Sequence, residues 1–171
     1  MPQNIEIKAK ASAPDKQWEL ARKFTTEPVI LEQEDTFYHS PNGRLKLRQF
    51  INLDRPAELI FYQRDNSPNP VPSHYQRVEI EDPVSINQLL SDSMGVMGTV
   101  RKTRELILYD NIRIHLDQVA DLGKFIELEV ILDENRDPEE GNNLAIKLMG
   151  KLQIRKEDLI SKAYIDLKIS S

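Results

Sequence analysis

The segment Gly43-Arg44-Leu45-Lys46-Leu47-Arg48 alternates cationic side chains with leucines. Successive side chains of a β-strand point to opposite faces, so the three cations share one face and the two leucines share the other. No acid lies among the cations, and they therefore repel one another. This repulsion suggests an anionic partner, although the solvated outer face of an amphipathic strand would show the same alternation.

The same alternation recurs along most of the chain and predicts about eight strands. Besides the segment above, these cover residues 4–10, 29–39, 57–64, 74–81, 100–109, 112–119 and 125–132. Helical spacing and capping signals predict helices after Ser12, from Ser85 and from Asp137 to Gly150, with a short helix over residues 156–160. Residues 65–73 contain three prolines and are predicted to form a loop.

The composition limits the kind of protein this can be. A length of 171 residues with 39% hydrophobic and 30% charged residues suits one domain over residues 1–171. The net charge of −5 argues against a nucleic-acid partner, because nucleic-acid-binding domains usually carry a basic excess. The chain has no Cys for disulfides or thiolate sites, no apolar run near the ~18 residues of a membrane span, and no signal-peptide pattern. We therefore expect a cytoplasmic protein, monomeric or homodimeric, without a membrane partner.

Two architectures fit the alternating strands. An open antiparallel sheet would leave its charged face in water, whereas a closed barrel would enclose the charged faces in a polar lumen. The alternation alone slightly favours the open sheet. The arrangement of charges favours the barrel, because cations gather on some strands and acids on others, and a solvated face would mix them. In the empty barrel, we expect acids to compensate the lumen cations only in part.

Arginine outnumbers lysine on the charged faces, and arginine suits bidentate contacts to phosphate oxygens. The cations of these faces are Arg44, Lys46, Arg48, Arg64, Arg77, Lys102, Arg104 and Arg113. Their acids are Glu6, Glu79, Asp117, Glu127 and Glu129. Separate cationic and acidic walls suit a polyphosphate that is bound together with divalent metal ions.

Several short motifs, in their order and spacing, resemble the CYTH or triphosphate tunnel metalloenzyme superfamily. They are Glu6-Ile-Lys8, Gly43-Arg-Leu-Lys-Leu-Arg48, Lys102-Thr-Arg104, Arg113-Ile-His-Leu-Asp117, Leu122-Gly123, Glu127-Leu-Glu129 and Tyr164. The resemblance covers almost the whole chain. It implies an α+β fold, a closed eight-stranded antiparallel β-barrel with helices packed outside, whose tunnel binds a triphosphate and a divalent metal. Members include class IV adenylyl cyclases, thiamine triphosphatases and tripolyphosphatases.

The resemblance also implies roles for individual residues. The expected metal ligands are Glu6, Glu127 and Glu129, with Glu79 and Asp117 as further candidates. The expected triphosphate-binding residues are Lys8, Arg44, Lys46, Arg48, Arg64, Arg77, Lys102, Arg104, Arg113 and His115. Glu6, Lys8 and Glu129 are the expected catalytic residues.

Two positions depart from the family pattern. Asn4 stands where the family has a glutamate, and Tyr62 stands where many members have a lysine. An amide is a weaker metal ligand than a carboxylate, which leaves one acidic contact open. Arg64 lies two residues after Tyr62 on the same face and is a candidate to replace the missing lysine.

The leading hypothesis is an enzyme dependent on Mg²⁺ or Mn²⁺ that hydrolyses inorganic tripolyphosphate or an organic triphosphate such as thiamine triphosphate. One alternative is a class IV-type adenylyl cyclase that converts ATP to cyclic AMP and pyrophosphate. Hydrolysis needs only the triphosphate site, whereas cyclisation also needs a base pocket, which the sequence does not identify. Another alternative is a non-catalytic module that binds polyphosphate or nucleotides, and Asn4 keeps that alternative open.

Overall fold

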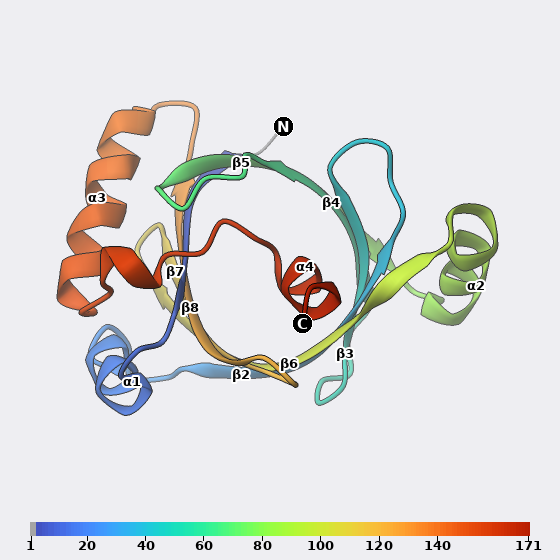
Figure 1. Cartoon of the computed structure of the whole chain (residues 1–171), viewed down its shortest axis with the longest axis horizontal. Coiled ribbons are helices and arrows are strands. Elements are labelled where there is room, and N and C mark those ends of the chain that lie inside the picture. Colours follow the sequence, from blue (N-terminus) through green and yellow to red (C-terminus); the bar gives the residue numbers. More distant parts are fainter. Residues whose placement is uncertain (1–2) are drawn as a thin grey trace.

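The computed structural model describes residues 3–171, and its strands close into an antiparallel barrel (Figure 1). The strands follow one another around the barrel in the order β1-β5-β4-β3-β2-β6-β7-β8, and β8 pairs with β1. Their bounds are β1 Gln3–Lys10, β2 Val29–Tyr38, β3 Arg44–Phe50, β4 Ala57–Arg64, β5 Val71–Ile80, β6 Val96–Tyr109, β7 Ile112–Val119 and β8 Gly123–Leu132. The α+β fold with a closed eight-stranded barrel is therefore confirmed, and the open sheet is excluded.

Helices cover the outside of the barrel wall (Figure 1). Those on the wall are α1 Pro14–Arg22, α2 Pro83–Met94 and α3 Pro138–Lys151, and the other helical segments are α4 Tyr164–Ile169 and a 3-10 turn over Lys156–Asp158. Helix α3 packs on β1 and β8, and α2 packs on β2 and β3. Helix α4 lies over one end of the barrel, where Tyr164 and Ile165 pack against Phe37 and Val100.

Burial under the helices decides which face of each strand points inward. Ile5 and Ile7 of β1 are buried in the core that lies beneath α1 and α3. Leu47 of β3 is buried in a second core with Leu90 of α2. Burying these apolar side chains stabilises the barrel by roughly 25 cal/mol per Å² of apolar surface removed from water. The charged residues between them, such as Lys46, are consequently directed into the lumen.

Some element boundaries differ from the sequence-based predictions. Strand β5 begins at Val71 inside the predicted loop, because Pro72 must lie opposite Ile5 for β5 to pair with β1 and close the barrel. Helix α2 begins earlier than expected, since the Asp82 side chain, rather than that of Ser85, caps it. The backbone N–H of Ser85 donates a 3.0 Å hydrogen bond to Asp82 Oδ1.

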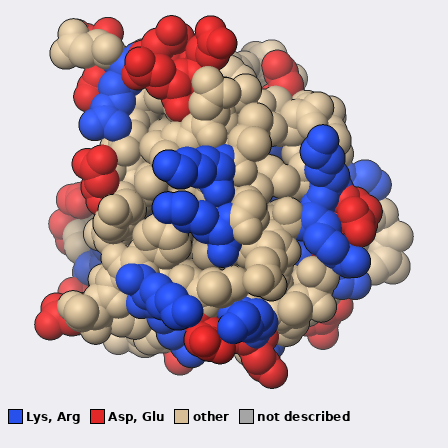
Figure 2. All heavy atoms as spheres, turned by 90° about the vertical axis from the view of Figure 1, so that its left-hand side faces the viewer, with Lys and Arg blue, Asp and Glu red and all other residues tan. Residues whose placement is uncertain are grey.

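The exterior carries charges of both signs. Figure 2 shows the face over α1 and α3, where lysine and arginine side chains lie across the middle and lower part and acidic side chains gather toward the edges. Within residues 3–171, no helix is both long enough and apolar enough to cross a membrane.

Candidate active site

The barrel encloses a cavity of about 310 Å³. All eight strands contribute side chains to it, and so do α4 and the segment before it. The charged residues that line it are Glu6, Lys8, Asp35, Arg44, Lys46, Arg48, Glu58, Arg64, Arg77, Lys102, Arg104, Arg113, Glu127, Glu129 and Asp166. A chamber of this size with so many ionised groups suits a small, highly charged ligand.

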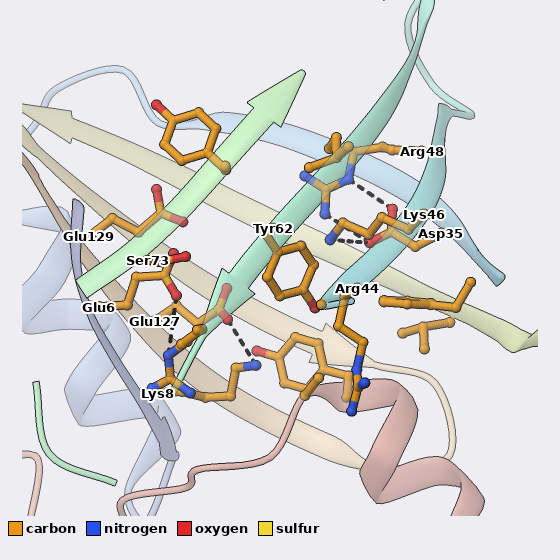
Figure 3. A pocket seen from close by; sticks show the side chains of 18 of the residues that line it. Glu6, Lys8, Asp35, Arg44, Lys46, Arg48, Tyr62, Ser73, Glu127 and Glu129 are labelled. Carbon is orange, nitrogen blue, oxygen red and sulfur yellow. Dashed lines mark hydrogen bonds and ion pairs between the residues drawn. The ribbon is translucent and has the colours of Figure 1, made fainter. Parts of the chain in front are cut away.

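One wall is built around a buried aspartate, Asp35, which contacts Lys46 and Arg48 (Figure 3). Lys102 contacts the same carboxylate, and we call the four residues the Asp35 cluster: Asp35, Lys46, Arg48 and Lys102. Arg48 donates from Nε to Asp35 Oδ1 and from Nη2 to Oδ2, both at 2.8 Å. The Nζ atoms of Lys46 and Lys102 each lie 3.0 Å from the same Oδ2 atom. One carboxylate on β2 thus joins cations from β3 and β6.

The cluster has more positive charge than one carboxylate can neutralise. Burial by itself would raise the pKa of Asp35, but the three cations outweigh burial and hold this pKa well below its ordinary value. Burial and the neighbouring cations lower the pKa of Lys46 to about 8 and that of Lys102 to about 7. An added anion in this part of the cavity would favour the charged forms of both lysines.

Two further arginines of the lumen also have carboxylate partners. Arg44 Nη2 donates to both oxygens of Asp166 on α4 at 2.8 Å. Arg104 forms a bidentate pair with Asp117 at 2.7 and 2.6 Å and also reaches Glu127 at 2.6 Å. Each lumen cation discussed so far therefore has an acidic partner, although the Asp35 cluster still sets three cations against one acid, so the compensation there is partial.

The opposite part of the cavity holds a carboxylate wall, which we define as Glu6, Glu127 and Glu129 (Figure 3). Glu6 of β1 lies directly opposite Glu129 of β8 in the strand register. Burial, then Glu129 and Glu127, raise the pKa of Glu6 to about 7. Lys8 Nζ lies 3.1 Å from Glu127 and Arg64 Nε lies 3.3 Å from Glu6, yet these cations do not offset the crowding of negative charge around Glu6.

The donor chemistry of the carboxylate wall fits a divalent metal, because Mg²⁺ and Mn²⁺ prefer carboxylate oxygens and the raised pKa of Glu6 marks a deficit of positive charge. Within residues 3–171, however, no three acidic or histidine side chains converge into a preformed site. The reason is that cations already hold these carboxylates, including Arg113, whose Nη1 lies 3.5 Å from Glu129. Asn4 is 3% exposed, and its Oδ1 atom has no hydrogen-bond partner in the described part of the chain.

The structure brings twelve of the expected site residues to the cavity. They are Glu6, Lys8, Arg44, Lys46, Arg48, Arg64, Arg77, Lys102, Arg104, Arg113, Glu127 and Glu129. Three others do not line it. Glu79 is exposed, and Asp117 is fully buried with both oxygens held by Arg104. His115 is buried behind the carboxylate wall, with Nδ1 3.3 Å from Glu127. The roles expected for all of these residues stay predictions.

Sequence reasoning missed several acids of the cavity, namely Asp35, Glu58 and Asp166. The alternation of β2 places Asp35 on the inner face, so this residue could have been found by applying the same period to that strand. Nothing in the local sequence indicates that Asp166 on α4 meets Arg44. Tyr164 packs against Phe125 and also donates a 2.7 Å hydrogen bond from its hydroxyl to Asp117.

The chain is similar to known proteins over nearly its whole length. A protein of Methanocaldococcus jannaschii, provisionally named an adenylate cyclase, is 27% identical over 170 residues, covering 96% of this chain and 97% of that protein. A solved structure from Pyrococcus horikoshii has a TM-score of 0.85 at 24% identity and covers 96% of this chain and 98% of its own. A Hippeastrum structure has a TM-score of 0.66 at 15% identity, covering 99% and 96% of the two chains; its description is a provisional adenylyl cyclase with a dominant triphosphatase activity.

The two structural likenesses, both below 25% identity, bear on the fold alone. The family assignment rests on a family model, described as the CYTH domain, that matches residues 2–164. That match includes every strand of the barrel and every residue of the Asp35 cluster and the carboxylate wall. The chain therefore belongs to the CYTH domain family.

Proposed function

We propose that this protein is an enzyme dependent on Mg²⁺ or Mn²⁺ that binds a triphosphate inside the barrel and hydrolyses it. One observation carries the proposal: the Asp35 cluster, with its excess of cations, and the carboxylate wall line one cavity of about 310 Å³. Cationic side chains hold phosphate oxygens, and carboxylates hold the divalent metal that accompanies a triphosphate.

In this proposal the cations bind and orient the phosphate chain. Lys46, Arg48 and Lys102 lie together on one side of the cavity, and Arg44 lies beside α4. All four come from strand positions that packing fixes on the barrel wall, so they need little reorganisation when a phosphate chain enters. Because Lys46, Arg48 and Lys102 are largely buried, their charge-assisted contacts are stronger than they would be on the surface.

Glu6, Glu127 and Glu129 would hold the metal, whose positive charge neutralises phosphoryl oxygens when it is bound. For this to happen, the carboxylates must exchange their contacts to Arg64, Lys8 and other cations for contacts to the metal. Lys8 lies 3.1 Å from Glu127 and 4.3 Å from the centre of the Tyr164 ring. We propose that its ammonium group, once released from Glu127, contacts a phosphoryl oxygen, which is the catalytic role expected for it.

Product analysis tests the proposal directly. Purified protein is incubated with tripolyphosphate, thiamine triphosphate or ATP, each with Mg²⁺ or Mn²⁺, and orthophosphate, pyrophosphate and cyclic AMP are measured. We expect metal-dependent release of orthophosphate or pyrophosphate from at least one substrate. Binding of these compounds without any turnover would instead support the non-catalytic binding module.

The second candidate function is an adenylyl cyclase, and the name of the Methanocaldococcus jannaschii relative favours it. A cyclase would release cyclic AMP and pyrophosphate from ATP in equal amounts. It would also need a surface for the adenine ring. Neutral lining residues of the cavity such as Tyr62, Tyr75 and Ile60 are candidates for such a surface. Equal amounts of the two products would replace hydrolysis by cyclisation as the assigned reaction.

A further inference from the structure

We infer that Asp35 is a positioning residue that takes the place of a phosphoryl group in the empty barrel. It holds Lys46, Arg48 and Lys102 together until the ligand displaces it as their partner. This inference rests on the proposed binding of a triphosphate, and it assigns Asp35 a role that differs from metal binding or direct contact with the substrate.

The geometry of the contacts carries the inference. Four hydrogen bonds from three cations end on one carboxylate, and three of the four end on Oδ2 alone. Asp35 is 1% exposed, so its carboxylate is shielded from bulk water and takes its hydrogen bonds from these cations. A phosphoryl group presents several oxygens to the same kinds of donors, which is why the carboxylate can stand in for it.

The charge balance explains why the carboxylate can be replaced. One negative charge faces three positive charges, so the cluster retains an excess of two if all three cations are protonated. Each lysine ammonium group has three N–H donors, and in the described residues only one hydrogen bond is recorded for each, to Asp35. Donors and positive charge are therefore left for an incoming anion, while Asp35 keeps the cations from repelling one another before it arrives.

The register of the strands explains why position 35 serves this purpose. Asp35 lies directly opposite Arg48 on β3 and opposite Val100 on β6. It is therefore central to a wall in which β3 supplies two cations and β6 supplies the third. Without it, Lys46 and Lys102 would have no ion-pair partner among the described residues. The remaining acid beside Arg48 would be Glu58, which lies opposite it on β4 and already pairs with Arg55 and Arg77, so buried positive charge would be left unpaired.

Thermal melts of Asp35→Asn test the inference, with Glu105→Gln as the matched control. Glu105 is also buried and also forms a bidentate pair, with Arg22 at 2.7 and 2.8 Å, but it lies outside the cavity lining. Both variants should melt lower than the wild type without ligand. Tripolyphosphate should bind Asp35→Asn about tenfold more tightly than the wild type and raise its Tm by roughly 3–6 °C more. Glu105→Gln should keep the wild-type Kd and the wild-type shift, and so should Asp35→Glu, which retains the charge.

The following results would overturn the role inferred for Asp35 or the proposed function on which it rests. An equal or smaller ligand-induced shift in Asp35→Asn than in the wild type would leave Asp35 as an ordinary structural acid and overturn the inference. If Asp35→Asn is unfolded without ligand, tripolyphosphate should restore a cooperative melt, and failure to do so at a concentration that saturates the wild type would also overturn it. If tripolyphosphate does not shift even the wild type, the proposed function fails first.

Discussion

The Asp35 cluster and the carboxylate wall line the same cavity, but they handle their charge in opposite ways. In the cluster, three cations converge on one acid, and the pKa of that acid is held well below its ordinary value. In the carboxylate wall, acids crowd one another, and the pKa of Glu6 is raised to about 7 despite nearby cations. The Asp35 cluster thus contains its own anion, Asp35, whereas the carboxylate wall lacks a cation with enough positive charge to balance its acids.

This difference shows why the barrel can fold with an empty lumen. Strand register brings a compensating acid to the cations, and lysine and arginine side chains to the acids, so no lumen charge named here is left wholly unpaired. The compensation is incomplete on both walls, and a metal–triphosphate complex supplies both missing charges at once. The predictions below test the two walls separately.

Loss of one carboxylate from the carboxylate wall should have the largest effect. We expect Glu129→Gln to reduce metal-dependent turnover by at least about a hundredfold, because removal of a direct ligand should exceed the 10–100-fold loss that follows from removing its supporting contacts. Glu32→Gln, an exposed change on the outer face of β2, is the control. Steady-state rates with Mg²⁺ and Mn²⁺ measure the effect. Full activity of Glu129→Gln, or full activity of the wild type in EDTA, would contradict a metal site here.

Loss of two cations from the cavity, Arg44 and Arg48, should have the next largest effect, namely on the stability gained when a ligand binds. At a hundredfold excess over its Kd, tripolyphosphate should stabilise the protein by ~2.7 kcal/mol and raise its Tm by roughly 5–10 °C. Orthophosphate should act weakly, and the double variant Arg44→Ala/Arg48→Ala should abolish the difference between the two ligands. Differential scanning fluorimetry at matched ionic strength measures these shifts.

The same double variant should melt below the wild type when no ligand is present. Relief of repulsion alone would stabilise it, but the structure shows that the substitutions remove the partner of Asp166 and one of three partners of Asp35. The control is Arg101→Ala/Arg155→Ala, which removes two exposed arginines and should leave both the Tm and the ligand response nearly unchanged. A double variant that melts higher than the wild type would mean that repulsion outweighs the ion pairs.

A smaller effect should appear in the pH dependence of binding. At pH 8, Lys102 with a pKa of about 7 is mostly neutral, and Lys46 with a pKa of about 8 is about half charged. A bound triphosphate favours the charged forms, so binding should take up protons and weaken as the pH rises from 7 to 9. Calorimetry in two buffers of different ionisation enthalpy measures the uptake, and Lys102→Arg, which stays charged, should reduce it. Equal enthalpies in both buffers would speak against these shifted lysines.

For the unliganded protein, the stability contributed by these lysines changes with pH in the opposite direction to ligand binding. Both lysine pKa values are lowered from 10.5, so between about pH 7 and 10.5 the unfolded chain binds more protons than the folded one. The contribution of these lysines to stability therefore grows as the pH rises through this window, while their contribution to anion binding declines.

The smallest effect should come from Asn4, beside the carboxylate wall. Asn4→Glu adds a fourth carboxylate near Glu6, so the metal-free protein should melt a few degrees lower, at ~2–4 °C per kcal/mol. Saturating Mg²⁺ should reverse this loss, because an added acid strengthens the attraction for a divalent cation. Melts with and without Mg²⁺ measure both, with Asn4→Ala as the neutral control. If Mg²⁺ stabilises Asn4→Glu no more than the wild type, position 4 lies outside the metal's reach.

The sequence by itself determined the two faces of the strands, because the period of two is a local property of an extended backbone. It placed Arg44, Lys46 and Arg48 on one face and Leu47 on the other, and the structure buries Leu47 under α2. It also gave a distribution of charge that favoured the lumen over the solvent face. These features need no knowledge of which strands become neighbours.

The tertiary structure alone decided which charges meet. Asp35 collects cations from β3 and β6, and Arg44 pairs with Asp166, which lies 122 residues away. Closure of the barrel also extended β5 back to Val71, across a proline that local rules assign to a loop. Pairing between distant strands overrides such local preferences because it gives the backbone N–H and C=O groups of a whole strand their hydrogen-bond partners. Charged side chains, in turn, can be buried only where the fold brings an oppositely charged partner within reach.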